Sequence, residues 1–358
     1  MDKRSRYRGC LLGGAMGDAL GAAIEFESLE EIHRRFGPSG IQTYAPAYGR
    51  TGAITDDTQM TLFTAEGLIR ALVRQRHEGT ANYASVTGNA YLRWLLTQGY
   101  GNHHKIDPLE NNPGWLYSQQ DLHAQRAPGT TCLTALSKTR EPGTKVENDS
   151  KGCGGVMRVA PAGLFAESEE EAFELGCELA ALTHGHPTGW LAGGALAAMI
   201  NALLRGAPLS DSVEAALLYL ERRPDHKETT HALRLATRLA ADGTAPEQAI
   251  ARLGEGWIAE EALAISVYCA MTAPDFRQGV ITAVNHDGDS DSTGAITGNL
   301  LGCIGGEACL PQDWLEGLEL RDVITELADD LIDCRGWNIG HGALDGDFDK
   351  RIWEKYPG

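Results

Sequence analysis

Residues 285–302 read NHDGDSDSTGAITGNLLG, and this stretch contains the two patterns around which the rest of the chain is organised. Its first half holds three aspartates at alternate positions: Asp287, Asp289 and Asp291. Ser292 and Thr293 follow, and a hydroxyl that caps the helix-like run after them would place the aspartates at its positive N-terminal end. The spacing does not fit an EF-hand calcium loop, which requires a central glycine and a final glutamate. Alone, the cluster is equally well explained as an acidic N-cap.

A row of glycines spaced four residues apart begins in the second half of this stretch. This row is Gly294, Gly298, Gly302 and Gly306, and a similar row near the start of the chain is Gly9, Gly13, Gly17 and Gly21. Residues four apart lie on one face of a helix. Each interior glycine costs a helix roughly 0.5–1 kcal/mol relative to alanine, so such a row indicates a neighbouring backbone packed very closely. We therefore predict two central helices that touch each other or share a neighbour.

A second acidic helix start occurs at residues 55–58, Thr-Asp-Asp-Thr, ahead of an apolar stripe with helical period. Two such clusters indicate a shared ion. The candidate metal ligands are Thr55, Asp56, Asp57, Asp289, Asp291 and Ser292. Because this set offers only hard oxygen atoms, it suits Mg²⁺ or Mn²⁺ better than zinc. Four carboxylates in one partly dry place would repel each other without cations, which favours two ions that share one carboxylate.

A glycine-rich turn at residues 151–158, KGCGGVMR, is a further candidate site. Its backbone amides could line a phosphate or ribose site, although a plain tight turn before a helix explains the same sequence. His184 follows a predicted helix that ends at Leu182, where histidine favours the helix dipole without any function.

The composition limits the classes of protein that this chain can belong to. The chain has 358 residues with 49 acidic and 31 basic side chains, a formal charge of −18, which argues against binding to nucleic acid or to anionic membranes. Eight scattered cysteines without C-x-x-C spacing, and no recognisable export signal, predict a cytoplasmic protein. The most apolar run, Leu191–Leu204, is shorter than a membrane span needs. Successive helical patterns with almost no strand alternation predict one all-α domain over residues 1–358.

Four motifs in this order resemble the ADP-ribosylglycohydrolase family of DraG-like hydrolases over nearly the whole chain. They are Gly17-Asp18-Ala19-Leu20-Gly21 with Glu25, Thr55-Asp56-Asp57-Thr58, Gly154-Gly155-Val156-Met157-Arg158-Val159-Ala160-Pro161, and Gly288-Asp289-Ser290-Asp291-Ser292. The resemblance implies a compact, orthogonal all-α bundle with two metal ions, Mg²⁺ or Mn²⁺, that cleaves ADP-ribose from a modified acceptor. Many relatives have threonine where Ser292 stands and asparagine where Cys153 stands.

The resemblance also implies a role for each candidate residue. Thr55, Asp56, Asp57 and Asp291 would hold one ion, and Asp289, Asp291 and Ser292 the other, with Asp291 as the bridge. Glu25 is similar to the mobile acid of the family, which transfers a proton or positions water, so Glu25 and Asp291 are the implied catalytic residues. The implied ADP-ribose contacts are Gly152, Cys153, Gly154, Gly155, Met157 and His184.

The predicted function is the hydrolysis of ADP-ribosylated protein side chains, with arginine as the first acceptor and a cognate ADP-ribosyltransferase as a possible partner. Two other functions stay open. One is a non-catalytic ADP-ribose-binding inhibitor of a transferase, and the other is a two-metal hydrolase of another ADP-ribose derivative. A helical structural protein with acidic caps is the remaining alternative.

Overall fold

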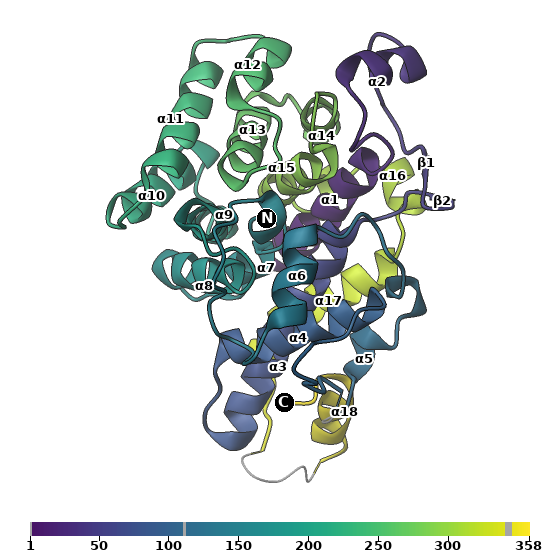
Figure 1. The fold of residues 1–358 in the computed structure, drawn as a ribbon, viewed down its shortest axis with the longest axis vertical. Coiled ribbons are helices and arrows are strands. Elements are labelled where there is room, and N and C mark those ends of the chain that lie inside the picture. Colours follow the sequence, from purple (N-terminus) through teal and green to yellow (C-terminus); the bar gives the residue numbers. More distant parts are fainter. Residues whose placement is uncertain (1, 110–111, 341–345) are drawn as a thin grey trace.

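Two glycine-faced helices, α1 (Lys3–Gly21) and α15 (Ser290–Gly305), pack against each other at the centre of the molecule (Figure 1). The facing pairs are Gly9 with Gly302, Gly13 with Gly298, and Gly17 with Gly294. A Cβ atom added at Gly13 would lie 2.5 Å from the carbonyl oxygen of Gly298, so the two backbones are in direct contact. The prediction of two central helices is confirmed, and they touch each other.

The computed structural model describes residues 2–109, 112–340 and 346–358. In the first half of the chain the helices after α1 are α2 (Leu29–Phe36), α3 (Asp56–Glu78), α4 (Tyr83–Thr97), α5 (Gly114–Tyr117), α6 (Thr130–Lys138), α7 (Ala160–Phe165) and α8 (Glu169–Ala181). In the second half they are α9 (Pro187–Leu204), α10 (Leu209–Glu221), α11 (Lys227–Ala241), α12 (Pro246–Leu253), α13 (Ala259–Thr272), α14 (Phe276–Val284), α16 (Gln312–Gly317), α17 (Arg321–Asp333) and α18 (Asp347–Lys355).

Short elements complete the described part of the chain. The 3₁₀ turns are η1 (Gln120–Leu122), η2 (Cys153–Gly155), η3 (Glu307–Cys309) and η4 (Cys334–Gly336). Strands β1 (Pro46–Ala47) and β2 (Arg50–Thr51) form a two-residue antiparallel pair, with Pro46 opposite Thr51. The predicted all-α bundle is therefore confirmed for the residues that the structure describes.

The helices surround the α1–α15 pair in groups that are far apart in sequence (Figure 1). Helices α9, α13 and α14 pack on α15, and α17 packs on α1. Helix α3 contacts α4, α7 and α17. The N-terminal ends of α3 and α15, more than 230 residues apart in the chain, are thereby brought to the same region of the bundle.

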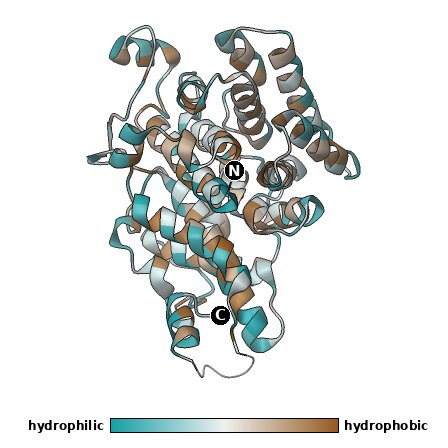
Figure 2. Cartoon of the chain, turned by 180° about the vertical axis from the view of Figure 1, so that it is seen from behind, coloured by the Kyte–Doolittle hydropathy of each residue, from teal (hydrophilic) through white to brown (hydrophobic). Residues whose placement is uncertain are grey.

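Helix α9 is the most apolar long helix and belongs to the core. It begins at Pro187, four residues before the predicted apolar run, so it reaches 18 residues and is, within the described residues, the one helix long and apolar enough to cross a membrane. However, 83% of it is buried inside the bundle, as in the core helix of a soluble protein. In Figure 2 the outer helices have hydrophobic and hydrophilic residues side by side along their length, as expected of amphipathic helices around such a core.

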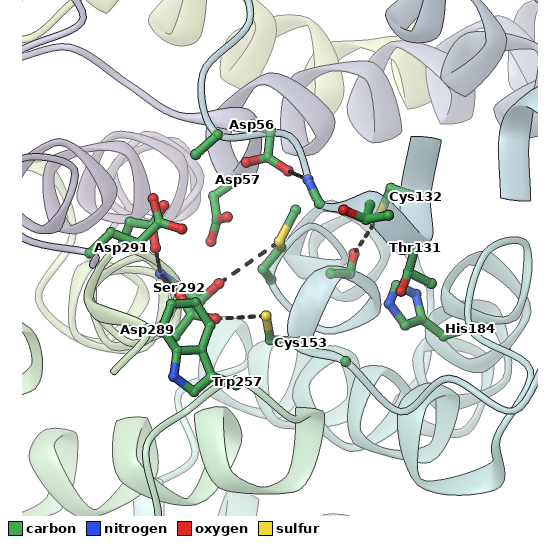
Figure 3. Close-up of a pocket in the computed structure, with 17 residues that line it drawn as sticks. Asp56, Asp57, Thr131, Cys132, Cys153, His184, Trp257, Asp289, Asp291 and Ser292 are labelled. Carbon is green, nitrogen blue, oxygen red and sulfur yellow. Dashed lines mark hydrogen bonds between the residues drawn. The ribbon is translucent and has the colours of Figure 1, made fainter. Parts of the chain in front are cut away.

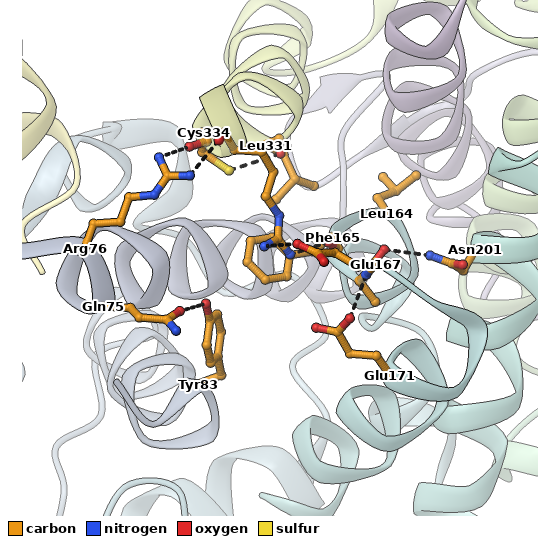
Figure 4. A network of polar contacts seen from close by, with 12 residues as sticks. Gln75, Arg76, Tyr83, Leu164, Phe165, Glu167, Glu171, Asn201, Leu331 and Cys334 are labelled. Carbon is orange, nitrogen blue, oxygen red and sulfur yellow. Dashed lines mark hydrogen bonds and ion pairs between the residues drawn. The ribbon is translucent and has the colours of Figure 1, made fainter. Parts of the chain in front are cut away.

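Near the C-terminal end of α3, side chains that donate to carbonyl groups hold neighbouring helix ends in place (Figure 4). The Arg76 guanidinium donates to the carbonyl oxygens of Cys334 at 2.7 Å and Arg335 at 2.6 Å, and so satisfies orphan acceptors at the end of α17. Asn201 of α9 donates to the carbonyl oxygens of Gly163 and Ala166 at the end of α7. These contacts attach α3 to the end of α17, and α9 to α7.

Candidate active site

The N-terminus of α3 is fixed by two polar side chains. Thr55 caps the helix, and its hydroxyl accepts a hydrogen bond from the Asp57 N–H at 3.3 Å. The buried carboxylate of Asp18, from α1, accepts the N–H groups of Thr55 at 3.0 Å and Thr58 at 3.1 Å. Asp18 is thus a positioning residue that joins α1 to the acidic start of α3. We did not predict this role, although an aspartate inside a glycine-rich apolar helix was a signal for it.

The N-terminus of α15 begins earlier than the sequence pattern predicted. Asp289, rather than Ser292 or Thr293, caps the helix, and its carboxylate accepts the Ser292 N–H at 3.3 Å. The Thr293 hydroxyl instead donates to the carbonyl oxygen of Asp289 at 2.8 Å, as is usual one turn inside a helix. Asp291 and Ser292 therefore lie in the first turn.

The two acidic helix starts meet Glu25 in one pocket of about 200 Å³ (Figure 3). One carboxylate oxygen from each of Glu25, Asp289 and Asp291 lies within 4.8 Å of the other two. Eleven of the thirteen predicted site residues line this pocket: Glu25, Asp56, Asp57, Gly152, Cys153, Gly154, Met157, His184, Asp289, Asp291 and Ser292. The other two, Thr55 and Gly155, are buried next to residues that line the pocket and do not line it themselves.

Burial and mutual repulsion dominate the electrostatics of the pocket. Burial, and then the charge of Asp291, raise the pKa of Glu25, Asp56, Asp57 and Asp289 well above the ordinary carboxyl values. Lysine and arginine are absent from the pocket lining in the described part of the chain, so no fixed cation balances these groups.

Two carboxylate oxygens of the pocket are buried without a hydrogen-bond donor among the residues that the structure describes. They are Oε2 of Glu25 and Oδ2 of Asp57. A buried acceptor without a partner is costly unless a cation or solvent satisfies it. Hard oxygen ligands that converge without a balancing charge fit divalent cations such as Mg²⁺ or Mn²⁺.

The 3₁₀ turn η2, which lies within the glycine-rich turn at residues 151–158, forms the wall of the pocket that faces the carboxylates. Its conformation does not depend on positive φ angles at Gly154 or Gly155. Instead, a Cβ atom at Gly154 would lie 2.9 Å from Cys132 Sγ and 3.0 Å from the His184 ring. A Cβ atom at Gly155 would lie 3.1 Å from the carbonyl oxygen of Gly189. Close packing therefore explains these glycines.

His184 follows α8 and is oriented by its neighbours. Its Nδ1 lies 2.9 Å from the Thr183 hydroxyl, which in turn accepts a hydrogen bond from Arg158 at 2.7 Å. Burial, with a smaller contribution from the Arg158 charge, lowers the pKa of His184 to about 3. The ring is therefore a neutral, fixed element of the pocket wall.

Several pocket residues were not predicted from the sequence. Trp257 lines the pocket and stacks on the exposed ring of Phe26, with ring centroids 5.9 Å apart. The irregular segment before α6 contributes Gly129, whose N–H donates to Asp56 at 3.2 Å. Thr131 and Cys132 of α6 also line the pocket (Figure 3). The sequence held two signals for this group: an aromatic residue directly after Glu25, and the length of the irregular segment that ends at Gly129.

The fold and the pocket together define an all-α protein with a buried carboxylate site suited to divalent cations. Residues 1–339 match the family model described as ADP-ribosylglycohydrolase, so the chain belongs to the ADP-ribosylglycohydrolase family. Members of this family are metal-dependent hydrolases of ADP-ribose linkages and act on ADP-ribosylated proteins. The prediction of one domain over residues 1–358 stays a prediction.

The relatives agree with this assignment. The chain is 27% identical to the ADP-ribosyl-[dinitrogen reductase] glycohydrolase of Rhodospirillum rubrum, covering 88% of this chain and 91% of the relative. It is 23% identical to the ADP-ribosylarginine hydrolase Tri1 of Pseudomonas putida, covering 92% and 78%. Among solved structures, an ADP-ribosylglycohydrolase-related protein complex has a TM-score of 0.67 at 25% identity, covering 93% of this chain and 98% of the other.

Proposed function

We propose that this protein is an ADP-ribosyl-acceptor hydrolase that removes ADP-ribose from modified protein side chains, arginine above all, with two divalent cations. The observation that carries the proposal is the meeting of Glu25 with the acidic starts of α3 and α15 in one buried pocket. Two oxygens there have no donor, and no lysine or arginine lines the described pocket. Both features support a role as ligands for metal cations.

We assign Thr55, Asp56, Asp57 and Asp291 to one ion and Asp289, Asp291 and Ser292 to the other, with Asp291 shared. The Thr55 hydroxyl can serve although it caps α3, because an oxygen that accepts one hydrogen bond retains a second lone pair. Two Mg²⁺ or Mn²⁺ ions, when bound, would polarise the hydroxyls of the distal ribose and a water molecule.

Glu25 is the proposed proton-handling group. Its Oε2 has no hydrogen-bond donor in the described part of the chain, and its carboxyl lies beside the Asp289 and Asp291 carboxylates. In this position Glu25 either takes a proton from the attacking water or orients that water without ionising it. Both roles require the carboxyl to be at the reacting C1″ carbon of the ribose.

The pocket wall formed by η2 and His184, which faces the carboxylates, is the proposed ADP-ribose site. The residues assigned to it are Gly152, Cys153, Gly154, Gly155, Met157 and His184. The small side chains of the turn allow a ligand to approach its backbone closely. A neutral, fixed His184 supports hydrogen bonding to ribose or phosphate without adding charge.

We extend the proposal to the acceptor and the setting of the reaction. Arginine is preferred because one of the two relatives is named as an ADP-ribosylarginine hydrolase. The charge of −18 supports a modified protein rather than nucleic acid or a membrane surface as the substrate. We also propose a cytoplasmic location and a cognate ADP-ribosyltransferase that forms the modification.

The test uses proteins that carry ADP-ribose on arginine, on serine or on glutamate. We expect release of free ADP-ribose and unmodified acceptor with Mg²⁺ or Mn²⁺, fastest from arginine, and no release after chelation with EDTA. Mass spectrometry of both products checks this. Binding of ADP-ribose without release from any substrate would support an inhibitory binding protein instead, and release only from other ADP-ribose derivatives would reassign the substrate.

A further inference from the structure

A second cavity, of about 730 Å³, lies between α3, α4 and the segment that follows α4, where the two helices run side by side (Figure 1). Its charged or titratable lining, among the described residues, is Arg70, Arg74, Arg93, His104, Lys105 and Asp107. None of these residues lines the candidate active site. Arg70 lies 13 residues beyond Asp57 along α3, about 20 Å at the rise of an α-helix.

Two of these arginines are buried and share one carboxylate. Arg70 is 4% exposed and Arg93 is 2% exposed. The buried carboxylate of Glu66 accepts a hydrogen bond from Arg93 at 2.9 Å and a longer one from Arg70 at 3.4 Å. Burial lowers the pKa of Arg70 to about 10; the Glu66 charge opposes this shift, and the charges of Arg93 and Arg74 add to it. One carboxylate therefore leaves positive charge uncompensated in this wall.

Two arginines of the lining also have a buried nitrogen without an acceptor. They are Arg74 and Arg93, whose Nε atoms have no hydrogen-bond partner in the described part of the chain. The Glu78 carboxylate is 3.9 Å from Nε of Arg74, beyond hydrogen-bond reach. The Asp107 carboxylate accepts the Leu109 N–H at 2.9 Å within its own turn. A buried donor without an acceptor is costly, and an anion in the cavity would supply the acceptor.

The charge and the shape of the cavity indicate the class of ligand. Four fixed cations line it, and three carboxylates in the described chain line it or pair with its arginines. This excess of positive charge contrasts with the formal charge of −18 for the whole chain. Val86, Ile106 and Pro142 add apolar walls, and the volume is within the range of about 300–1,000 Å³ typical of small-molecule sites.

We propose that this cavity is a second ligand site, separate from the active site, which binds a phosphate-bearing small molecule through Arg74, Arg93 and Lys105. A guanidinium group can donate two parallel N–H groups to one phosphate, and lysine adds a point charge. Arg70 contributes its charge, since it already donates to the carbonyl oxygen of Pro357 at 2.7 Å. Free diphosphate and a nucleotide share this chemistry. The proposal does not depend on the hydrolase activity.

The first experiment is calorimetry on the full-length protein in EDTA, with pyrophosphate as the probe. We expect a dissociation constant below about 1 mM for the wild type. The double variant Arg74→Gln, Lys105→Gln should bind at least tenfold more weakly, and it should fold because Arg74 is only half-buried and Lys105 is exposed. The double variant Arg34→Gln, Lys227→Gln is the matched control, because it removes the same charge from exposed positions on α2 and α11. It should keep the wild-type affinity.

Arg93→Lys tests the buried donor directly. The substitution keeps the positive charge beside Glu66 but removes the guanidinium group, so pyrophosphate should bind more weakly while the circular dichroism spectrum stays that of the wild type. If this buried variant does not fold, the exposed pair Arg74 and Lys105 still decides the result.

Inorganic phosphate and ADP, used in the same titrations, distinguish the two sources of the ligand. ADP can also enter the active site, so only the part of its binding that Arg74→Gln, Lys105→Gln loses belongs to this cavity. If that part is tighter than pyrophosphate binding, the ligand is a nucleotide; if it is equal or weaker, the ligand is free phosphate or diphosphate.

Two results would overturn the proposal: no binding of any of the three probes by the wild-type protein, or equal affinities for Arg74→Gln, Lys105→Gln and its control. EDTA keeps divalent cations out of these titrations, and no turnover is measured. A failure of the hydrolase assay would therefore count against the proposed function alone, and a failure here would count against the second site alone.

Discussion

Glu25 combines three features at the scale of a single residue: burial, an oxygen without a donor, and two carboxylate neighbours. Burial and the charges of Asp291 and Asp289 raise the pKa of Glu25 far above the usual carboxyl value, so proton affinity is its main chemical property here. The features of this residue are of the kind found at functional sites.

We expect Glu25→Gln to fold normally and to lose about two to four orders of magnitude in kcat, as is typical when a general acid–base group is removed. The substitution keeps the shape of the side chain and removes only its charge and proton transfer. Single-turnover release of ADP-ribose from a modified protein checks this, with circular dichroism as the control for folding. A rate near that of the wild type across the pH range would exclude Glu25 from proton handling.

His184 gives a prediction about pH and stability. Its pKa in the folded protein is lowered to about 3, so between pH 6.5 and 3 the unfolded chain binds a proton that the folded protein does not. The contribution of His184 to the free energy of unfolding is therefore fully present above about pH 6.5. Below that pH the free energy of unfolding falls by up to about 1.4 kcal/mol per pH unit because of this group. We expect His184→Gln to lose that part of the slope in urea unfolding measured at pH 7, 6 and 5. Equal slopes for both proteins would contradict this.

At the scale of elements, the contact between α1 and α15 is decided by the absence of side chains. Small residues let the two helix backbones meet, and this contact places Asp18 of α1 against the start of α3 and Gly21 against the start of α15. The acidic helix ends are therefore positioned by the same packing that forms the core.

We expect Gly17→Ala to destabilise the protein by more than about 2 kcal/mol, although alanine is the better helix former by about 1 kcal/mol. The added Cβ would collide with the carbonyl oxygen of Gly294 and force the two helices apart. Gly336→Ala, in η4, is the matched control, because among the described residues no atom beyond its chain neighbours lies within 4 Å of its Cβ position. Urea unfolding should show a change of less than about 0.5 kcal/mol for the control. Similar small changes for both variants would show that the contact tolerates a methyl group.

For the whole molecule, the proposed metal site would couple cation binding to folding, because its carboxylates are buried. A cation that binds only the folded protein stabilises it by about 2.7 kcal/mol at a concentration 100 times its dissociation constant. We expect Mg²⁺ or Mn²⁺ to raise the melting temperature by several degrees, which scanning fluorimetry can measure. Asp291→Asn should reduce this shift the most, because the proposal makes Asp291 the shared ligand. An unchanged melting temperature with both metals would count against a metal site.

The amino-acid sequence determined the features that are periodic or local. The glycine rows predicted the central helix pair, and the Thr55-Asp56-Asp57 start of α3 was read correctly, because helix faces and caps depend on residues within one or two turns. It misplaced the start of α15, where Asp289 competes successfully with Ser292 and Thr293 for the capping position.

Only the tertiary structure decided which distant groups meet. Three contacts join segments between 37 and 231 residues apart in the chain. They are the stacking of Phe26 on Trp257, the hydrogen bond that Asp18 accepts from the start of α3, and the contact of Cys153 with Asp289. Residue spacing carries no information about such contacts, because they depend on how the whole bundle packs. The sequence therefore predicted which side chains form the candidate site, and the packing of α1 against α15 brings them together.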